Sequence, residues 1–212
     1  MVGELPASFV VALQQALPNI YQEAYQQAFS QPLWEKSEGR YLVGHLRHAL
    51  FEAQFRNAAR EAGLKTGLTR VPIGSYEYSY VRAGKLFLTA SALPSEDDIV
   101  RPAFFRQQHA LVNHFLSNPT LPIIDPPDLT SVDTIYGIVI HVPYAEDKAQ
   151  CSYAGIAIPN EGTTEWVEQL SLADLSKAQA QATQAKPETT EDRAHPRKKD
   201  EGQRKKEGSG NE

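Results

Sequence analysis

Apolar residues recur at helical spacing in two long stretches near the N-terminus. Residues 7–30 carry one apolar stripe at i, i+4 spacing, which comprises Ile20, Tyr21, Ala24, Tyr25, Ala28 and Phe29. Pro18 suits the first turn of a helix, where a missing N–H is harmless, so we expect a second helix to begin there. A longer helix is predicted from Ser37, which can cap it, to Ala62, before a stop at Gly63.

Two β-hairpins are predicted in the rest of the chain. Residues 76–81 alternate with period two, residues 82–85 form a turn, and residues 86–90 form the returning strand. Residues 134–142 are the most apolar run, which predicts a central strand buried on both faces. A polar loop then leads to a neighbouring strand over residues 152–158, so we expect a second hairpin.

Helical patterning returns in two shorter segments. One helix is predicted over residues 102–117, and a short one follows Thr163 or Thr164 and contains Trp166, Val167 and Leu170. The predicted order is helix, helix, strand, strand, helix, strand, strand, short helix. This order indicates an α+β fold with a mainly antiparallel sheet of about four strands and three or four helices packed largely on one face.

The apolar pattern stops at about Leu175. Residues 176–212 contain no Val, Ile, Leu, Phe, Tyr, Trp or Met, and such a segment cannot offset its ordering entropy by burial. We therefore predict a single α+β domain over residues 1–175 and a disordered, charged, low-complexity tail over residues 176–212. The first part of the tail, residues 176–184, is rich in Ala and Gln and can extend the last helix weakly.

Charge is distributed unevenly between the predicted domain and the tail. The chain has 21 Lys and Arg against 26 Asp and Glu, and the tail holds nine and seven of them, which leaves 12 and 19, a net −7, for residues 1–175. An acidic domain is a poor electrostatic match for nucleic acid. Residues 59–66 resemble the turn of a helix-turn-helix motif, but the recognition helix that would follow, residues 65–71, meets Pro72 after two turns.

The single cysteine, Cys151, excludes an intramolecular disulfide and a cysteine-based zinc cluster. The N-terminus lacks the basic and long apolar regions of a signal peptide, and no run approaches the roughly 20 apolar residues of a membrane span. These features favour a cytoplasmic protein without a membrane partner.

Four polar residues share one stripe of the long predicted helix: His45, His48, Glu52 and Arg56. Two histidines and a carboxylate at this spacing can ligate zinc or iron, so His45, His48 and Glu52 form a candidate metal site. The same pattern is typical of a solvated helix edge, on which Glu52 and Arg56 make an ordinary i, i+4 ion pair. The spacing lacks the Glu of a His-Glu-x-x-His metalloprotease helix.

His141 ends the apolar strand, a position at which sheets often present functional groups. It is a candidate general base, and with Glu52 it makes the candidate catalytic pair of a metal-dependent or His-based hydrolase. A metal-dependent nuclease needs convergent acids and often a lysine, and Asp133, Glu77 and Lys85 are present without that pattern. The alternative is a hydrogen-bonded histidine at the edge of the sheet.

Three tyrosines share one face of the strand over residues 76–81: Tyr76, Tyr78 and Tyr80. They can form a recognition platform for a protein or peptide, and Arg56 is a further candidate binding residue. More often such a row packs beneath a helix or lines a half-wet sheet face.

Nucleophile, phosphate-loop and dinucleotide motifs are absent from the sequence, which leaves the cofactor, if there is one, unknown. The leading hypothesis is a non-catalytic intracellular binding or regulatory protein that acts through a protein partner. Two alternatives stay open. One is the hydrolase, possibly a nuclease, built on the histidines. The other is a nucleic-acid-binding protein that uses the basic triplets of the tail, residues 197–199 and 204–206. The sequence does not decide whether the protein is an enzyme.

Overall fold

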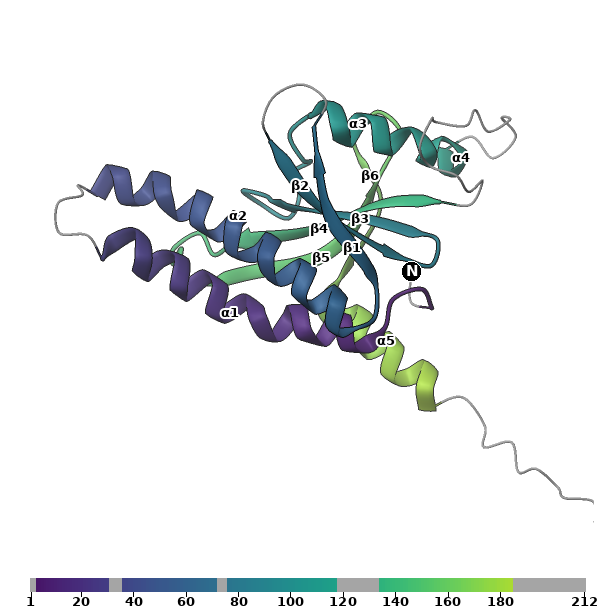
Figure 1. Cartoon of the computed structure of the whole chain (residues 1–212), viewed down its shortest axis with the longest axis horizontal. Coiled ribbons are helices and arrows are strands. Elements are labelled where there is room, and N and C mark those ends of the chain that lie inside the picture. The colour runs from purple at the N-terminus through teal and green to yellow at the C-terminus, as the bar shows by residue number, and fades with distance from the viewer. Residues whose placement is uncertain (1–2, 31–35, 72–75, 118–133, 185–212) are drawn as a thin grey trace, which may run out of the picture.

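The computed structural model describes residues 3–30, 36–71, 76–117 and 134–184. In these segments six strands form one sheet in the order of the sequence (Figure 1): β1 (Lys65–Arg70), β2 (Glu77–Ala83), β3 (Leu86–Ala92), β4 (Ile135–Pro143), β5 (Cys151–Pro159) and β6 (Trp166–Ser171). All neighbours are antiparallel except β3 and β4, which run parallel. A parallel pair needs a crossover connection, and here the crossover carries the helical segment 104–117.

Helices flank the sheet on both faces (Figure 1). One face is covered by α1 (Ala7–Phe29), α2 (Lys36–Glu61) and α5 (Leu172–Gln184). The other is covered by α3 (Phe104–Ala110), which continues into the 3-10 turn η1 (Leu111–Asn113) and α4 (His114–Ser117). Each side has its own apolar core, which we call the α1–α2 core and the α3 core. None of the helices in the described segments is long and apolar enough to cross a membrane.

The predicted α+β class is confirmed, and so are both hairpins. β2 and β3 are joined at Gly84, whose φ of +55° is a left-handed conformation that glycine adopts without strain. β4 is buried except at its two end residues, and β5 returns beside it. The helix α2 stops at the predicted glycine. Gly63 has a φ of +71°, and the N–H of Leu64 donates to the carbonyl of Ala59 at 2.8 Å, as in a Schellman cap.

The sheet has six strands, whereas about four were predicted, because the sequence did not reveal either edge strand. β1 occupies residues that the sequence assigned to a possible recognition helix, so the helix-turn-helix interpretation was wrong. β6 replaces the short helix expected around Trp166. Neither strand contains a fully buried residue. An edge strand pairs with one neighbour and buries little, so it shows no clear alternation of apolar residues.

The helix α1 is one helix rather than two, because Pro18 lies inside it. A proline there removes the N–H that would bond to the carbonyl of Gln14, at a typical cost of about 3 kcal/mol. Apolar side chains on both sides of the proline are buried in the same stripe: Leu13, Leu17, Ile20 and Tyr21. Their burial holds the helix together across the missing hydrogen bond.

Pro18→Ala is expected to stabilise the protein by about 1–2 kcal/mol. It restores a helical hydrogen bond at an exposed position, although it also gives the unfolded chain more freedom. Pro18→Gly should gain less, because glycine costs about 1 kcal/mol more than alanine in a helix interior. Urea denaturation of the three proteins measures both differences. A loss of stability in Pro18→Ala would mean that the packing of α1 depends on the proline.

Helix α5 continues beyond residue 175 and packs against α1 and the N-terminal segment. Gln179 is buried and its amide donates to the carbonyl of Leu5 at 2.7 Å, while Ser176 donates to the side chain of Gln14 at 2.8 Å. The helical structure therefore includes the Ala- and Gln-rich segment up to Gln184. The rest of the predicted tail, residues 185–212, lies outside the described residues.

Candidate binding site at the carboxyl ends of the parallel strands

Several of the predicted site residues meet at one end of the sheet. The parallel strands β3 and β4 end side by side there, with Ala92 opposite His141, and β2 begins at the same end. Side chains from α2 reach this end from one face, and those from α3 reach it from the other. Open sheets with parallel strands bind ligands preferentially outside the carboxyl ends of those strands.

His141 lies in a buried group of aromatic and cationic side chains. Its Nδ1 is 2.8 Å from the hydroxyl of Tyr21, and its ring centroid is 4.2 Å from that of Phe51. The guanidinium of Arg47 lies 4.7 Å from the centroid of the Tyr21 ring. Burial and, after it, the charge of Arg47 lower the pKa of His141 to about 3. The imidazole is therefore neutral near pH 7.

His48 and Tyr76 connect α2 to the start of β2 on the outer side of this group. Nε2 of His48 is 2.8 Å from the hydroxyl of Tyr76, and the two rings are stacked. Burial lowers the pKa of His48, and the charge of Glu52 opposes that shift. Because Tyr76 is 45% exposed, the group reaches solvent at this point.

Glu52 is buried and links α2 to β2 by a hydrogen bond. Its Oε2 accepts the N–H of Ser79 at 2.9 Å and lies 3.9 Å from Nη1 of Arg56, which also donates to the hydroxyl of Ser79. The predicted i, i+4 ion pair is thus confirmed, but it is tied to the sheet instead of lying on a solvated edge. The other carboxylate oxygen of Glu52, Oε1, is buried and has no hydrogen-bond partner among the described residues.

Arg106 reaches the same end of the sheet from α3. It donates to the hydroxyl of Ser91 and to the carbonyl of Arg101, each at 3.1 Å, and its guanidinium lies 5.0 Å from the ring centroid of Phe105. The ring of Tyr76 lies 6.4 Å from that of Phe105, so α2 and α3 meet around this tyrosine. We call the residues that lie at this end of the sheet, on both of its faces, the strand-end cluster: Tyr21, Arg47, His48, Glu52, Tyr76, Arg106 and His141.

The three candidate metal ligands are not gathered around one point. His45 is exposed on α2 and contacts the ring of Tyr41, with centroids 4.7 Å apart. His48 and Glu52 are hydrogen-bonded to different groups at the start of β2. In the described parts of the chain, no three His, Cys, Asp or Glu side chains are placed so that they can hold a metal ion.

The row of tyrosines lies mostly beneath α3. Tyr78 is 5% exposed, stacks on Phe105 with centroids 4.2 Å apart, and bonds through its hydroxyl to Nε2 of His109 at 2.7 Å. Tyr80 is half-buried and packs against the α3 core. Tyr76 alone of the three is exposed, so the row is not a continuous exposed platform.

Sequence reasoning did not single out Tyr21, Arg47 or Arg106 as site residues. For Arg47 a signal was present, because it stands one helical turn before Phe51 on the buried stripe that continues to Phe55. A charged residue on such a stripe is a candidate for function. The sequence pattern assigned Tyr21 to the core. Arg106 lies on the helix that connects β3 to β4, and it reaches this end of the sheet only because those two strands are parallel.

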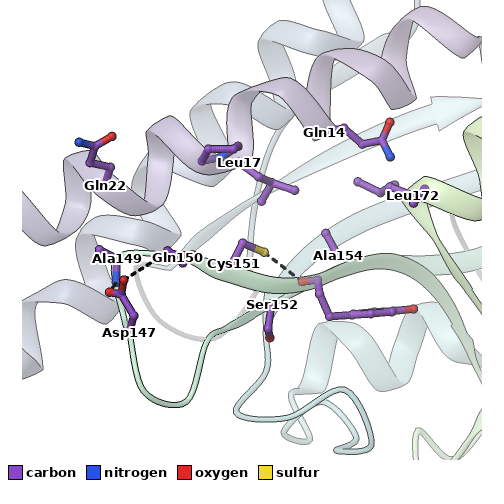
Figure 2. Close-up of a pocket in the computed structure, with 13 residues that line it drawn as sticks. Gln14, Leu17, Gln22, Asp147, Ala149, Gln150, Cys151, Ser152, Ala154 and Leu172 are labelled. Atoms are coloured by element: carbon purple, nitrogen blue, oxygen red, sulfur yellow. Dashed lines mark hydrogen bonds between the residues drawn. The ribbon is translucent and has the colours of Figure 1, made fainter.

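A pocket of about 660 Å³ opens between α1, the β4–β5 loop, β5 and the start of α5 (Figure 2). Gln14, Leu17 and Gln22 line it from α1, and Cys151 lines it from β5. The thiol of Cys151 donates to the carbonyl of Tyr153 at 3.1 Å, and burial raises the pKa of Cys151. It therefore stays a thiol near pH 7. None of the predicted catalytic or metal-binding residues lines this pocket.

Exposed aromatic side chains lie at the far end of the α1–α2 hairpin, which extends beyond the sheet (Figure 1). Tyr25 and Phe29 of α1 are 38% and 37% exposed, with rings 4.7 Å apart, and Tyr41 of α2 is 71% exposed. The buried α1–α2 core ends at Tyr21 on α1 and begins at Phe51 on α2. We call Tyr25, Phe29 and Tyr41 the aromatic tip.

Comparison with protein families, with curated proteins and with solved structures finds no match for this chain. A functional proposal therefore rests on the geometry of the strand-end cluster and of the aromatic tip.

Proposed function

We propose that this protein is a non-catalytic binding or regulatory protein that acts through a protein partner, which it holds at the aromatic tip. The observation that carries this proposal is the exposure of three large aromatic side chains on the part of the hairpin that extends past the sheet. Burying apolar surface stabilises a complex by about 25 cal/mol per Å² before the costs of association. Tyr and Phe are also enriched at interface centres.

The surroundings of the tip suit a protein interface. Residues 24–29 contain no charged side chain, and two glutamines supply neutral amides between the aromatic residues. Interface centres are depleted of charge because desolvating a charge is costly. Phe29 lies so close to Gly39 that a Cβ there would clash with its ring. A ring held in place by packing loses little rotamer entropy when a partner binds.

The strand-end cluster supports binding better than hydrolysis. The two predicted catalytic groups are each engaged by other neighbours: His141 is fully buried and bonded to Tyr21, and Glu52 is bonded to Ser79 and paired with Arg56. A general base has to lie within hydrogen-bond reach of the proton that it removes. A substrate cannot meet that condition at His141 while α1 and α2 cover it.

The double variant Tyr25→Ala/Tyr41→Ala is expected to bind the partner at least tenfold more weakly than wild type. Truncating an aromatic anchor commonly costs more than about 1 kcal/mol, and two are removed here. The full chain serves as bait in a nuclease-treated extract of its source cells. The captured protein is identified by mass spectrometry, and the Kd of the purified complex is then measured for each variant.

Phe104→Ala is the matched control, because Phe104 is a 50% exposed aromatic residue on α3, on the opposite face of the sheet. It should bind the partner as wild type does. Equal Kd values for the double variant and wild type would contradict the tip as the contact surface. A partner that is captured only without nuclease treatment would contradict direct protein binding.

A further inference from the structure

The strand β5 lacks a neighbouring strand along the first part of one edge. β4 already pairs with it at Cys151, but the pairing with β6 on the other side starts only at Gly155, opposite Ser171. Among the described residues, no strand pairs with that edge over residues 151–154. Main-chain groups of alternate residues in an antiparallel strand point to opposite sides, so part of the N–H and C=O groups in this stretch point away from β4. Such an edge is a template for pairing with another chain.

The edge is open because the chain leaves the sheet at Ser171 to form α5. The hydroxyl of Ser171 accepts the N–H of Asp174 at 3.0 Å and donates to the carboxylate of Asp174 at 2.7 Å, which caps the start of the helix. Ser176 then joins α5 to α1 through its hydrogen bond to Gln14. These bonds fix the point at which β6 ends, so the first residues of β5 stay available to a further strand.

The pocket of about 660 Å³ follows this open edge (Figure 2), and we call it the strand-edge groove. Residues 151–154 all line it, and because consecutive side chains of a strand point to opposite faces, the edge of β5 forms this wall. The facing wall is α1 from Gln14 to Gln22, which are about 12 Å apart along a helix. Four extended residues span about 13 Å. The groove therefore has the length of an extended segment of about four residues.

The side chains of the strand-edge groove favour a segment with apolar and basic residues. Leu17 and Leu172 give it apolar walls on the side of the helices. Among the described residues, no Lys, Arg or His lines it, and its charged side chain is that of Asp147. The two carboxylate oxygens of Asp147 accept the N–H of Ala149 at 2.9 Å and the amide of Gln150 at 2.7 Å, which holds the carboxylate in place. Each oxygen has a further lone pair for a Lys or Arg of the bound segment, whereas acidic residues are repelled.

We propose that the strand-edge groove binds an extended peptide segment of a partner protein, which adds to the sheet as a strand beside residues 151–154. Its main chain pairs with the open N–H and C=O groups of β5, alternate side chains that face α1 are apolar, and a basic residue lies beside Asp147. The chain's own residues 176–212 do not fit this description, because they contain no large apolar residue. The site is also separate from the aromatic tip, since none of the three tip residues lines the groove.

Selection of displayed random heptapeptides on the full chain tests this site, with Ala173→Trp as the counter-target. Ala173 is exposed and lines the groove, so an indole there obstructs it without entering the core. Ala182→Trp is the matched control, because Ala182 is exposed on the opposite side of the same helix. Enriched peptides should have equal Kd values for wild type and Ala182→Trp and bind Ala173→Trp at least about tenfold more weakly, because the indole clashes with them. The double variant Tyr25→Ala/Tyr41→Ala should bind them as wild type does, which keeps this test independent of the aromatic tip.

A backbone N-methylated form of the tightest peptide separates strand addition from apolar contact alone. It keeps every side chain but loses main-chain donors, so it should bind at least about tenfold more weakly. The unmodified peptide should also slow hydrogen exchange of the backbone amides in residues 151–154. Equal Kd values for the two forms overturn the proposal, as does a selection that enriches no peptide over the counter-target. Enriched peptides dominated by Asp and Glu overturn it too, because they contradict the charge of the groove.

Discussion

Asn113→Ala is expected to lower the free energy of unfolding by about 3–5 kcal/mol, a large effect for a single polar substitution. Asn113 is fully buried in η1. Its amide donates to the carbonyls of Tyr136 and Pro159 at 2.9 and 2.8 Å, and its side-chain oxygen accepts the N–H of Tyr136 at 2.9 Å. Alanine leaves three buried backbone groups without these bonds, and each typically costs about 1–3 kcal/mol. The side chain therefore holds the crossover segment against β4 and β5.

Asn113→Asp separates hydrogen bonding from packing, because it changes the side-chain volume very little. Its carboxylate would face the two carbonyl oxygens that the amide now bonds, so we expect it to destabilise the protein at pH 7 at least as much as alanine does. Asn57→Ala is the control, since Asn57 is exposed on α2 and should cost less than about 1 kcal/mol. Urea denaturation of wild type and the three variants gives the four free energies of unfolding. An Asn113→Asp variant as stable as wild type would contradict the hydrogen-bond argument.

The central elements of the fold could be predicted because burial imposes a pattern on their sequences. The strand β4 is buried on both faces and reads as an uninterrupted apolar run, and α2 ends at a glycine with positive φ. The edge strands β1 and β6 bury too little to leave such a pattern. The prediction that a second helix begins at Pro18 was wrong. The burial of the side chains around Pro18 outweighs the preference of proline for the first turn of a helix.

Part of the candidate site could be predicted from the sequence, because titratable residue types are candidates for function wherever they occur. His48, Glu52 and His141 stand out in a sequence because their side chains titrate, and the structure does bring them to the same end of the sheet. The side chains that surround these three residues could not be predicted, because they come close only in the tertiary structure. Tyr21 meets His141 only because α1 lies across β4, and 120 positions separate the two residues in the chain. Arg106 requires the parallel pairing of β3 and β4, which the sequence did not reveal.

Two histidines, the buried His141 and the half-buried His109, are expected to make the protein acid-sensitive. Burial lowers the pKa of His141 to about 3 and that of His109 to about 4, and the charges of Arg47 and Arg82 respectively add to these shifts. An unfolded chain has a histidine pKa of about 6.5. Between these values the unfolded state binds protons that the folded state does not. The stabilisation is therefore complete above about pH 6.5 and is lost as the pH falls towards the folded pKa values.

At pH 4 the loss should amount to about 3 kcal/mol for each histidine, relative to pH 7. His141→Asn and His109→Asn should therefore each reduce the difference in unfolding free energy between pH 7 and pH 4 by about that amount, whatever their stability at pH 7. Urea denaturation at both pH values, at constant ionic strength, gives the comparison. His45→Asn on the surface of α2 should keep the wild-type difference. If His141→Asn also kept the wild-type difference, His141 would not be a buried neutral imidazole.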